Sequence, residues 1–346
     1  MASIASLRLA ADDAGIARAA AILRRGGLVA FPTETVYGLG ANALDPAAAA
    51  RIFVAKGRPA DDPLIVHLAG LAWLERVAES NPVTLALAEA FWPGPLTLVL
   101  PRRDVVPMAV TAGLQTVAVR VPAHPIAHAL LVASDLPLAA PSANLFSRPS
   151  PTRAQHVLDD LDGRIDAVLD GGATPIGLES TIVDVSGDRP RLLRPGGIPA
   201  ESVAEVLGTT LDPPPTRITG AQPAPGLLPT HYAPRTPLIV IRGVPAITRQ
   251  HLLNEVRAAL AAGRRVGVLA LEEDVPDVPA GAVIQHVGSF ERAALTAARL
   301  FDALRLLDAQ GLDVLYARQL ADPDTGLGRA LADRLQRAAQ QVVVPQ

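Results

Sequence analysis

The sequence predicts an α/β protein with two domains: an N-terminal domain built on a twisted, mixed sheet with flanking helices, and a smaller βαβ-type domain. Three observations support this prediction. Helical and strand-like patterns alternate over the first two hundred residues and again near the C-terminus. A proline-rich stretch separates the two alternating regions. The length of 346 residues also exceeds what one ordinary core accommodates. We therefore expect domains at 1–208 and 237–346, joined by a linker at 209–236.

The N-terminal alternation follows from local signals. Asp12 is placed to cap a first helix, which Gly26-Gly27 ends. A short apolar run then stops at Pro32, and Pro46 sits where a second helix begins. The further runs predict strands at 28–31, 64–68, 96–100, 116–121, 138–140, 167–169 and 181–185. Predicted helices are 12–25, 46–56, 83–91, 126–133 and 153–161.

The second alternation begins after the proline-rich run DPPPTRITGAQPAPGLLPTHYAPRTP. This run cannot form a helix or a central strand, so we expect a semi-extended linker. Beyond it, the predicted strands are 238–241, 266–271 and 314–317, and the predicted helices are 251–262, 290–309 and 327–339.

Composition excludes several classes of protein. The chain has no cysteine, which excludes disulfides, thiolate zinc sites, iron–sulfur clusters and a cysteine nucleophile. Its net charge of -3 argues against a protein that coats nucleic acid. The N-terminus lacks the pattern of a secretory signal, and no apolar run approaches the ~20 residues of a membrane span. We therefore expect a cytoplasmic protein.

Two polar clusters follow apolar strands in the first third of the chain. The stretch FPTETVYGLG places two threonines, a carboxylate and a phenol directly after a predicted strand. A capped turn would use the same residues, but the ends of strands in α/β sheets are also where ligands bind. In KGRPADDPLIVH, Lys56 and Arg58 are placed to converge on a polyphosphate. A solvated basic loop is the alternative, and His67 alone is more often structural.

Two later clusters repeat the pattern. Arg120 ends the run TVAVR, and burying it requires an anionic partner, either a fixed salt bridge or a substrate carboxylate. Ser142 and Asn144 follow another strand, and Arg194 leads into Gly196-Gly197. No Gly-x-Ser-x-Gly, Walker A or Gly-x-Gly-x-x-Gly pattern is present. Together the clusters predict a site for anions and phosphates, without a nucleophile elbow.

In order, these stretches resemble the YrdC-like family of L-threonylcarbamoyladenylate synthases. The matching stretches, which cover nearly all of 8–208, are FPTETVYGLGANA, KGRPADDPLIVHL, FWPGPLTLVL, TVAVRVPAHP, PLAAPSAN, GLESTIVDV and LLRPGGI. The family's Lys-x-Arg…Ser-x-Asn signature is present as Lys56, Arg58, Ser142 and Asn144, which the resemblance marks as catalytic. The linker and second domain resemble the long form of the family. The implied fold is a YrdC-like open twisted mixed sheet with flanking helices, plus a Rossmann-like C-terminal domain.

The resemblance implies a nucleotidyltransferase, an L-threonylcarbamoyladenylate synthase. It would convert L-threonine, bicarbonate and ATP, with magnesium on the phosphates, into threonylcarbamoyl-AMP and pyrophosphate. The product would pass to a complex that modifies tRNA, with weak or no direct RNA binding by this chain. The expected L-threonine site is Thr35, His67, Arg120, Ala140 and Ser180. The expected ATP site is Arg58, Asp62, Thr116, Ser142, Ser150, Arg194 and Tyr232. No residue is expected to hold a metal ion.

Elementary chemistry agrees with this assignment. A substrate carboxylate suits Arg120, and a carbamate attacking the α-phosphorus needs alignment and charge neutralisation more than a protein nucleophile. His67 is a candidate base by position only. Because a carbamate hydrolyses readily, the linker is expected to act as a lid that excludes water. One departure is Leu228-Pro229-Thr230, which stands where long members commonly carry a Lys-Tyr-Arg-like run.

Two rival functions use the same fold. The first is an RNA-binding module, against which the net charge of -3 and the 3% of aromatic residues weigh. The second is the related domain of hydrogenase-maturation carbamoyltransferases. Those proteins carry cysteine-rich zinc motifs, which a chain without cysteine cannot supply.

Overall fold

A computed structural model of the chain describes residues 5–214, 220–228 and 230–345. Two compact units make up the chain: unit 1 comprises residues 1–146 and 150–227, and unit 2 comprises 147–149 and 228–346. The division falls inside the predicted linker, so part of that segment belongs to each unit. Pro229, one of the three residues at the linker departure, lies outside the described residues.

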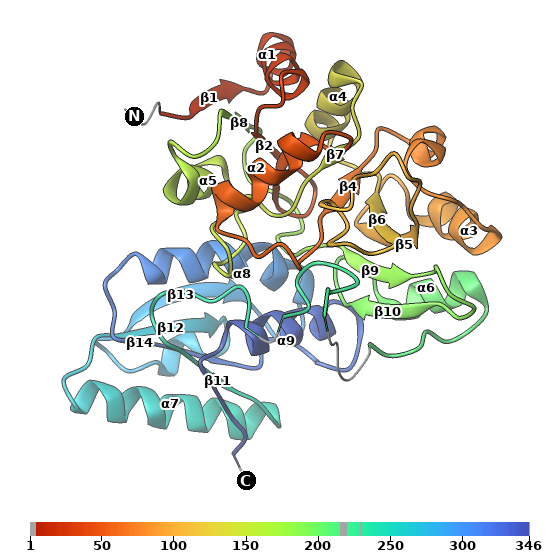
Figure 1. The fold of residues 1–346 in the computed structure, drawn as a ribbon. Helices are drawn as coiled ribbons and strands as arrows, with labels where there is room; N and C mark the ends of the chain where they lie inside the picture. The colour runs from red at the N-terminus through yellow and green to blue at the C-terminus, as the bar shows by residue number, and fades with distance from the viewer. Residues whose placement is uncertain (1–4, 215–219, 229, 346) are drawn as a thin grey trace. The chain divides into compact units, whose positions relative to one another are not determined.

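Unit 1 is built on a ten-stranded mixed sheet (Figure 1). Both parallel and antiparallel pairs occur: β4 runs parallel to β6, whereas β5 runs antiparallel to β6. In sheet order the strands are β1 (Leu7–Ala10), β8 (Ala167–Asp170), β2 (Val29–Pro32), β3 (Tyr37–Asn42), β7 (Leu138–Ala139), β4 (Ile65–His67), β6 (Thr116–Arg120), β5 (Leu96–Pro101), β9 (Thr181–Asp184) and β10 (Arg191–Arg194).

The helices of unit 1 are α1 (Asp13–Arg24), α2 (Pro46–Lys56), α3 (Pro82–Phe91), α4 (Pro125–Ser134), α5 (Ala154–Leu161) and α6 (Ala200–Leu207), with a 3₁₀ helix at Leu71–Arg76. The expected signals start the first two: the Asp12 side chain accepts from Gly15 N, and Pro46 stands at the first turn of α2. Helices α2, α3 and α5 contribute to one apolar core. Helices α1 and α4, side by side in Figure 1, form a second core against residues such as Val29 and Phe31.

Helices α1 and α4 cover one half of their sheet face. The other half, which includes β4 and β6, is covered differently. Because side chains alternate along a strand, Ile65 and His67 share a face with Ala118 and Arg120. Apolar residues form a floor there, with Ala224 and Leu227 packed on them: Ile65, Val99, Ala118, Ile182 and Leu193. Among the described residues, the cover of this floor comes from segment 220–227 of the predicted linker and from no helix.

Unit 2 is a five-stranded parallel sheet in the order β13 (Val283–Gly288), β12 (Val266–Leu271), β14 (Val314–Arg318), β11 (Leu238–Ile241) and β15 (Gln341–Val343). Helix α7 (Pro245–Ala261) covers one face, and α8 (Ala293–Asp308) and α9 (Gly326–Ala338) lie on the other (Figure 1). A short 3₁₀ helix lies at Val275–Asp277. The parallel arrangement confirms the predicted βαβ-type, Rossmann-like unit.

The predicted α/β class is confirmed, and the predicted elements are present with shifts at their ends, the largest at α7, which begins at Pro245 instead of residue 251. The sequence patterns missed β1, β3, β10, α6, β13 and β15. Strand β3 was missed because its sequence, YGLGAN, contains two glycines, which are depleted in strands. A side chain at Gly40 would lie 2.8 Å from the Phe31 ring, so the pairing of β2 with β3 requires the glycine.

Candidate functional site

The predicted site residues of unit 1 gather around the half-face that segment 220–227 covers. His67 and Arg120 end the parallel strands β4 and β6 and are paired in register. Ala140 follows β7 and donates its N–H to Ile65 O at 2.8 Å, at the other end of β4. Asp62 and Arg58 precede β4 at this same end. The site therefore extends along β4, with Arg120 at one end and Arg58 at the other.

The loop between β2 and β3 is held rigidly at the Arg120 end. Thr33 Oγ1 donates to Val36 O at 2.6 Å and lies 2.8 Å from Thr35 Oγ1. The backbone oxygens of Glu34 and Thr35 accept from the N–H groups of Ile176 and Gly177. The capped-turn alternative is thus realised at Thr33, and Thr35 accepts a hydrogen bond from Arg120. Ligand binding by this cluster stays a prediction.

Arg120 is buried at 3% exposure and has an internal partner. Its Nη2 lies 2.6 Å from Glu34 Oε1, Nη1 donates to Thr35 Oγ1 at 2.9 Å, and Nε donates to Gly94 O at 3.2 Å. A fixed salt bridge therefore satisfies the burial that suggested a substrate carboxylate. These contacts use three of the five N–H donors of a guanidinium.

His67 is fully buried beside this pair. Its Nδ1 lies 3.2 Å from Ile65 O, and its ring meets Phe31 edge-on with centroids 6.1 Å apart. Burial, and then the charge of Arg120, lower the pKa of His67 to about 3. The imidazole is therefore neutral and weakly basic at neutral pH, which argues against His67 as the base that the sequence suggested by position.

The lowered pKa of His67 predicts a loss of stability in acid. Between pH 6.5 and 3 the unfolded chain binds a proton that the folded chain excludes, so stability falls as the pH falls. At pH 5 the loss is about 2 kcal/mol relative to pH 7.5. We expect His67→Gln to lack this part of the pH dependence. Urea unfolding of both proteins at pH 7.5 and 5.0 measures it, and an equal slope in the two would contradict it.

Lys56 joins the end of α2 to the loop after β7. Its Nζ donates to the backbone oxygens of Ser142 and Asn144, both at 2.5 Å, and the side chain is 2% exposed. Of the 31 lysine and arginine residues in the chain, Lys56 is the only lysine. Three donors on a compact ammonium suit two converging carbonyls better than a planar guanidinium does. The single lysine was visible in the sequence, but it was not used to predict this contact.

Three cations surround one carboxylate at the other end of the site. Arg58 Nη2 lies 2.9 Å from Asp62 Oδ2, and both side chains are buried. Burial raises the pKa of Asp62, and Arg58, Lys56 and Arg194 all oppose this rise through their charges. Asp61 adds a second negative charge, so three positive charges stand against two negative ones, and the net positive charge suits a polyanion.

Arg194 links this cation cluster to the cover of the site. Its guanidinium donates to Ser180 O at 3.0 Å and to Pro225 O at 3.0 Å, and Gln222 N donates to Asp61 O at 3.1 Å. Ser180 Oγ in turn lies 2.7 Å from Thr97 Oγ1. Segment 220–227 is therefore tied at two points to the residues that it covers.

The remaining predicted residues are less closely connected. Ser150 is buried and donates its hydroxyl to Glu179, the residue before Ser180. Thr116 begins β6 and lies about 13 Å along the strand from Arg120.

Tyr232 belongs to unit 2. Its ring is 1% exposed and lies 5.5 Å from the Phe301 ring and 5.2 Å from the Arg334 guanidinium. These contacts within unit 2 fix the ring. The predicted contact of Tyr232 with ATP stays a prediction.

Three residues of the site were missed from sequence. Glu34 partners Arg120, Thr97 partners Ser180, and Glu179 accepts from Ser150. Glu34 was visible as the one carboxylate in FPTETVYGLG, directly before Thr35. Glu179 was visible in the same way in GLESTIVDV, directly before Ser180. Thr97 carried no signal, because its partner lies 83 residues away.

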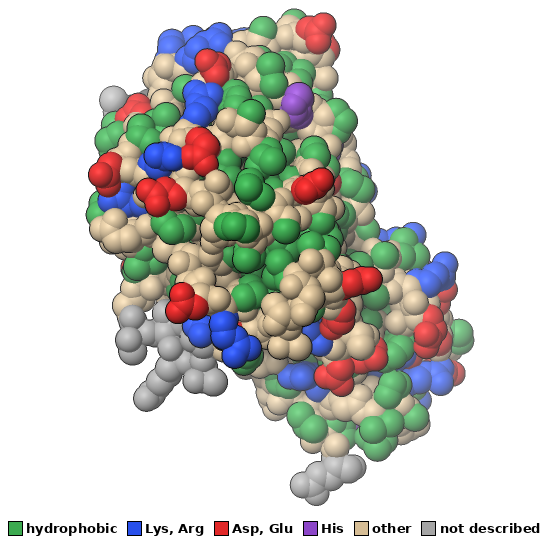
Figure 2. All heavy atoms as spheres, turned by 90° about the vertical axis from the view of Figure 1, so that its right-hand side faces the viewer, with side chains coloured by type: hydrophobic (Ala, Val, Ile, Leu, Met, Phe, Trp, Pro, Cys, Tyr) green, Lys and Arg blue, Asp and Glu red, His purple; other side chains and the backbone are tan. Residues whose placement is uncertain are grey.

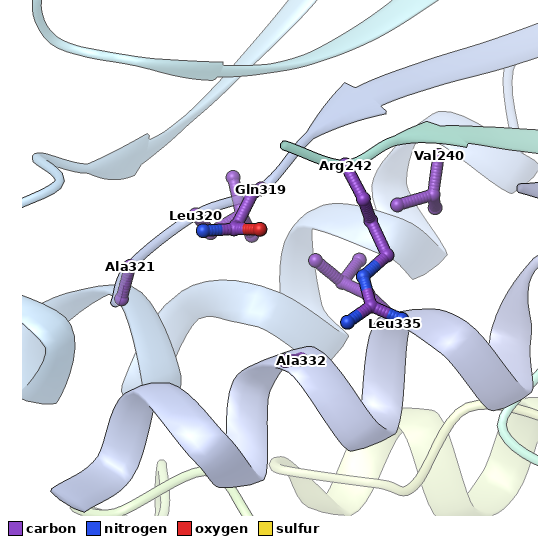
Figure 3. A pocket seen from close by; sticks show the side chains of 7 residues that line it. All are labelled: Val240, Arg242, Gln319, Leu320, Ala321, Ala332 and Leu335. Carbon is purple, nitrogen blue, oxygen red and sulfur yellow. The ribbon is translucent and has the colours of Figure 1, made fainter. Parts of the chain in front are cut away.

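Two depressions in the surface of the described residues lie outside the predicted site. Figure 3 shows a pocket at the ends of β11 and β14 lined by Val240, Arg242, Gln319, Leu320, Ala321, Ala332 and Leu335. Its volume of about 10 Å³ is at the lower limit for one water molecule. A shallow depression of about 370 Å³ lies on α2 between Arg51 and Arg164. Neither contains a predicted site residue.

Surface charges, metal-ligand groups and helix hydrophobicity add three further observations. In Figure 2 the basic side chains of the visible face are interspersed with acidic ones instead of forming a stripe. Within residues 5–214, 220–228 and 230–345, no group of three or more His, Asp or Glu side chains is placed to hold a metal ion. No helix in these ranges is long and apolar enough to cross a membrane.

Comparison with known proteins gives two family matches. A family model described as "Telomere recombination" (Sua5_yciO_yrdC) matches residues 21–196. A second model, described as the C-terminal domain of threonylcarbamoyl-AMP synthase, matches residues 198–340.

Several relatives match along the whole chain. The threonylcarbamoyl-AMP synthase of Bacillus subtilis is 47% identical over 96% of this chain and 94% of its own length. That of Pyrococcus abyssi is 44% identical over 98% of both chains. The crystal structure of P. abyssi Sua5 complexed with L-threonine superimposes with a TM-score of 0.91 at 42% identity, covering 98% of this chain and 99% of that one.

Proposed function

The chain belongs to the Sua5/YrdC family of threonylcarbamoyl-AMP synthases, and from this membership we propose how it makes threonylcarbamoyl-AMP. The reaction is an adenylyl transfer: L-threonine, bicarbonate and ATP give threonylcarbamoyl-AMP and pyrophosphate. One observation supports this proposed function best. Charged residues are arranged along β4, with one arginine at the His67 end and three cations at the Asp62 end.

The two ends suit the two organic substrates. At one end, Arg120 offers two N–H donors, and Thr35 and His67 are beside it. We place the threonine carboxylate there, with Ala140 and Ser180 completing the site. At the other end, Arg58, Lys56 and Arg194 neutralise the phosphates, and Ser142, Asn144, Asp62, Thr116 and Ser150 line the nucleotide. The distance of about 13 Å between Thr116 and Arg120 leaves room for both substrates.

The chemistry needs alignment more than a nucleophile. The threonine amine attacks the carbon of bicarbonate, water leaves, and the resulting carbamate oxygen attacks the α-phosphorus as pyrophosphate leaves. The residues act by binding the carboxylate and by neutralising phosphate charge. Lys56 contributes in a further way, because its two hydrogen bonds fix the loop of Ser142 and Asn144.

Segment 220–227 is the lid of this proposal. Ala224 and Leu227 cover the apolar floor between the two ends, and Pro225 is bonded to Arg194. Exclusion of water protects the carbamate from hydrolysis. Since Arg194 also faces the phosphates, binding of ATP would change the contacts that hold the segment.

Magnesium fits this site only as a companion of ATP. The described carboxylate near the phosphates, Asp62, is already paired with Arg58, and no cluster of metal ligands surrounds it in the described ranges. The residues present thus do not form a protein-held metal site.

The proposal also covers where the product goes and in which compartment the reaction takes place. We propose that threonylcarbamoyl-AMP passes to a separate complex that transfers the threonylcarbamoyl group to tRNA, and that this takes place in the cytoplasm. The interspersed charges of the face in Figure 2 favour weak or no RNA binding by this chain.

The test is pyrophosphate release from MgATP with and without L-threonine and bicarbonate. We expect release only when both are present. Arg120→Ala should lower kcat/KM for threonine at least 100-fold, about 2.7 kcal/mol, because the threonine carboxylate loses the guanidinium that binds it. Arg76→Ala, which removes a partly exposed arginine, is the matched control.

Two outcomes would contradict the assignment. Release that is indifferent to threonine would exclude a threonine-dependent synthase. No release, combined with salt-dependent binding of RNA, would instead favour the RNA-binding function. Since Arg120→Ala leaves Glu34 buried without its partner, Arg120→Lys serves as a second variant that keeps the charge but not the fork.

A further inference from the structure

Glu34 is a buried carboxylate that the reaction described above does not use. It is 6% exposed and lies in the rigid loop between β2 and β3, directly before Thr35. Its Oε1 pairs with Arg120 Nη2 at 2.6 Å. Both carboxylate oxygens are enclosed, and neither has a hydrogen bond of good geometry within the described residues, although the backbone N–H groups of Glu34 and Ala123 lie near the carboxylate. A buried carboxylate with incomplete hydrogen bonding is costly, so its position calls for an explanation.

The surroundings of Glu34 keep it ionised. Burial raises the pKa of Glu34, but the charge and hydrogen bond of Arg120, with the backbone N–H groups of Glu34 and Ala123, lower it further than burial raises it. The other titratable groups that face it are two histidines. Burial lowers the pKa of both His67 and the half-buried His124, so neither supplies a positive charge at neutral pH. Glu34 and Arg120 therefore form one negative and one positive charge side by side.

This pair has the charge pattern that complements a free amino acid. At neutral pH an amino acid is a zwitterion whose carboxylate and ammonium lie on the same carbon. Arg120 has two N–H donors left for the carboxylate, and Glu34 Oε2 has acceptor capacity left for the ammonium. A site with both charges favours the zwitterion over a ligand that has the carboxylate alone.

From this geometry we infer that Glu34 is a further substrate-binding residue, which accepts a hydrogen bond from the α-ammonium of the amino-acid substrate. The inference rests on the proposed function, since it places threonine at Arg120. It adds the reason why the site selects an α-amino acid. A hydroxy acid of the same shape would leave the Glu34 carboxylate buried and without a new partner.

The test compares two ligands in the absence of ATP and bicarbonate, so that it does not depend on turnover. Titration calorimetry measures the affinities for L-threonine and for 3-hydroxybutyrate, which is threonine without its amine. We expect wild type to prefer threonine at least 30-fold. Glu34→Gln should bind threonine at least 10-fold more weakly but bind 3-hydroxybutyrate within 3-fold of wild type. Glu75→Gln, which removes the same charge from an exposed pair with Arg103, should match wild type with both ligands.

The outcomes separate ligand recognition from a purely structural role. If Glu34 only fixes Arg120, Glu34→Gln will weaken both ligands equally, because both depend on the Arg120 fork. That result, or equal affinity of wild type for the two ligands, would overturn the inference. If Glu34→Gln does not fold, Glu34→Asp keeps the charge with a shorter reach and is expected to retain part of the preference. Threonine binding without pyrophosphate release would contradict the proposed function and leave this inference standing.

Discussion

Replacing Lys56 by methionine is expected to lower kcat/KM at least 1000-fold, about 4 kcal/mol of transition-state stabilisation. The substitution removes one of three cations at the phosphate end and leaves two buried carbonyls, those of Ser142 and Asn144, without their donor. Each orphaned carbonyl costs about 1–3 kcal/mol, so the variant should also lose about 3 kcal/mol of stability. Pyrophosphate release and urea unfolding measure the two effects.

Lys56→Arg separates charge from shape at the same position. The guanidinium keeps the positive charge, but it is larger and planar, and the site is 2% exposed. We expect at least a 100-fold loss of kcat/KM despite the retained charge. Near wild-type activity in Lys56→Arg would contradict the role of the two carbonyl contacts. It would also leave the single lysine among 31 basic residues without a structural reason.

Gly196→Ala is expected to destabilise unit 1 by about 3 kcal/mol and to weaken the binding of both substrates. A Cβ at this position would lie 2.3 Å from Ser180 C and 2.4 Å from both Glu179 O and Thr181 N. These are backbone atoms, so the segment that carries Ser180 has to move. Ser180 Oγ lies against Thr97, and Ser180 O accepts from Arg194, so the displacement reaches both ends of the site.

Gly187→Ala is the matched control for this substitution. Gly187 is exposed, and a Cβ there would meet nothing within 4 Å. We expect its stability to stay within about 0.5 kcal/mol of wild type. Thermal unfolding and threonine affinity, measured for the two variants, test this prediction. Wild-type stability and affinity in Gly196→Ala would show that the backbone at Ser180 adapts without consequence.

The predicted site in unit 1 shows how much could be predicted from residue types alone. Polar residues after apolar runs indicated the ends of strands, and such ends meet at one edge of an α/β sheet. The structure brings Lys56 to Ser142 and Asn144 and brings Arg120 to Thr35, as this reasoning requires. What the pattern could not supply was the partner of each charge, because a partner is set by which strands are neighbours.

Arg120 illustrates this limit. From the sequence, a fixed salt bridge and a substrate carboxylate were equally able to explain an arginine at the end of a valine-rich strand. The structure contains the salt bridge to Glu34, 86 residues away, and still leaves two N–H donors. The salt bridge is therefore realised, whereas a substrate carboxylate at Arg120 stays a prediction that the salt bridge does not exclude.

The sequence by itself determined the α/β class, the two alternating regions, the absence of cysteine chemistry and the residue types of the site. These properties depend on periodicity and composition, which are local. The tertiary structure decided that His67 is neutral, that segment 220–227 covers the floor of the site, and that Glu34 faces Arg120. Burial and charge pairing depend on residues that are far apart in the chain and become neighbours only when the strands take their order in the sheet.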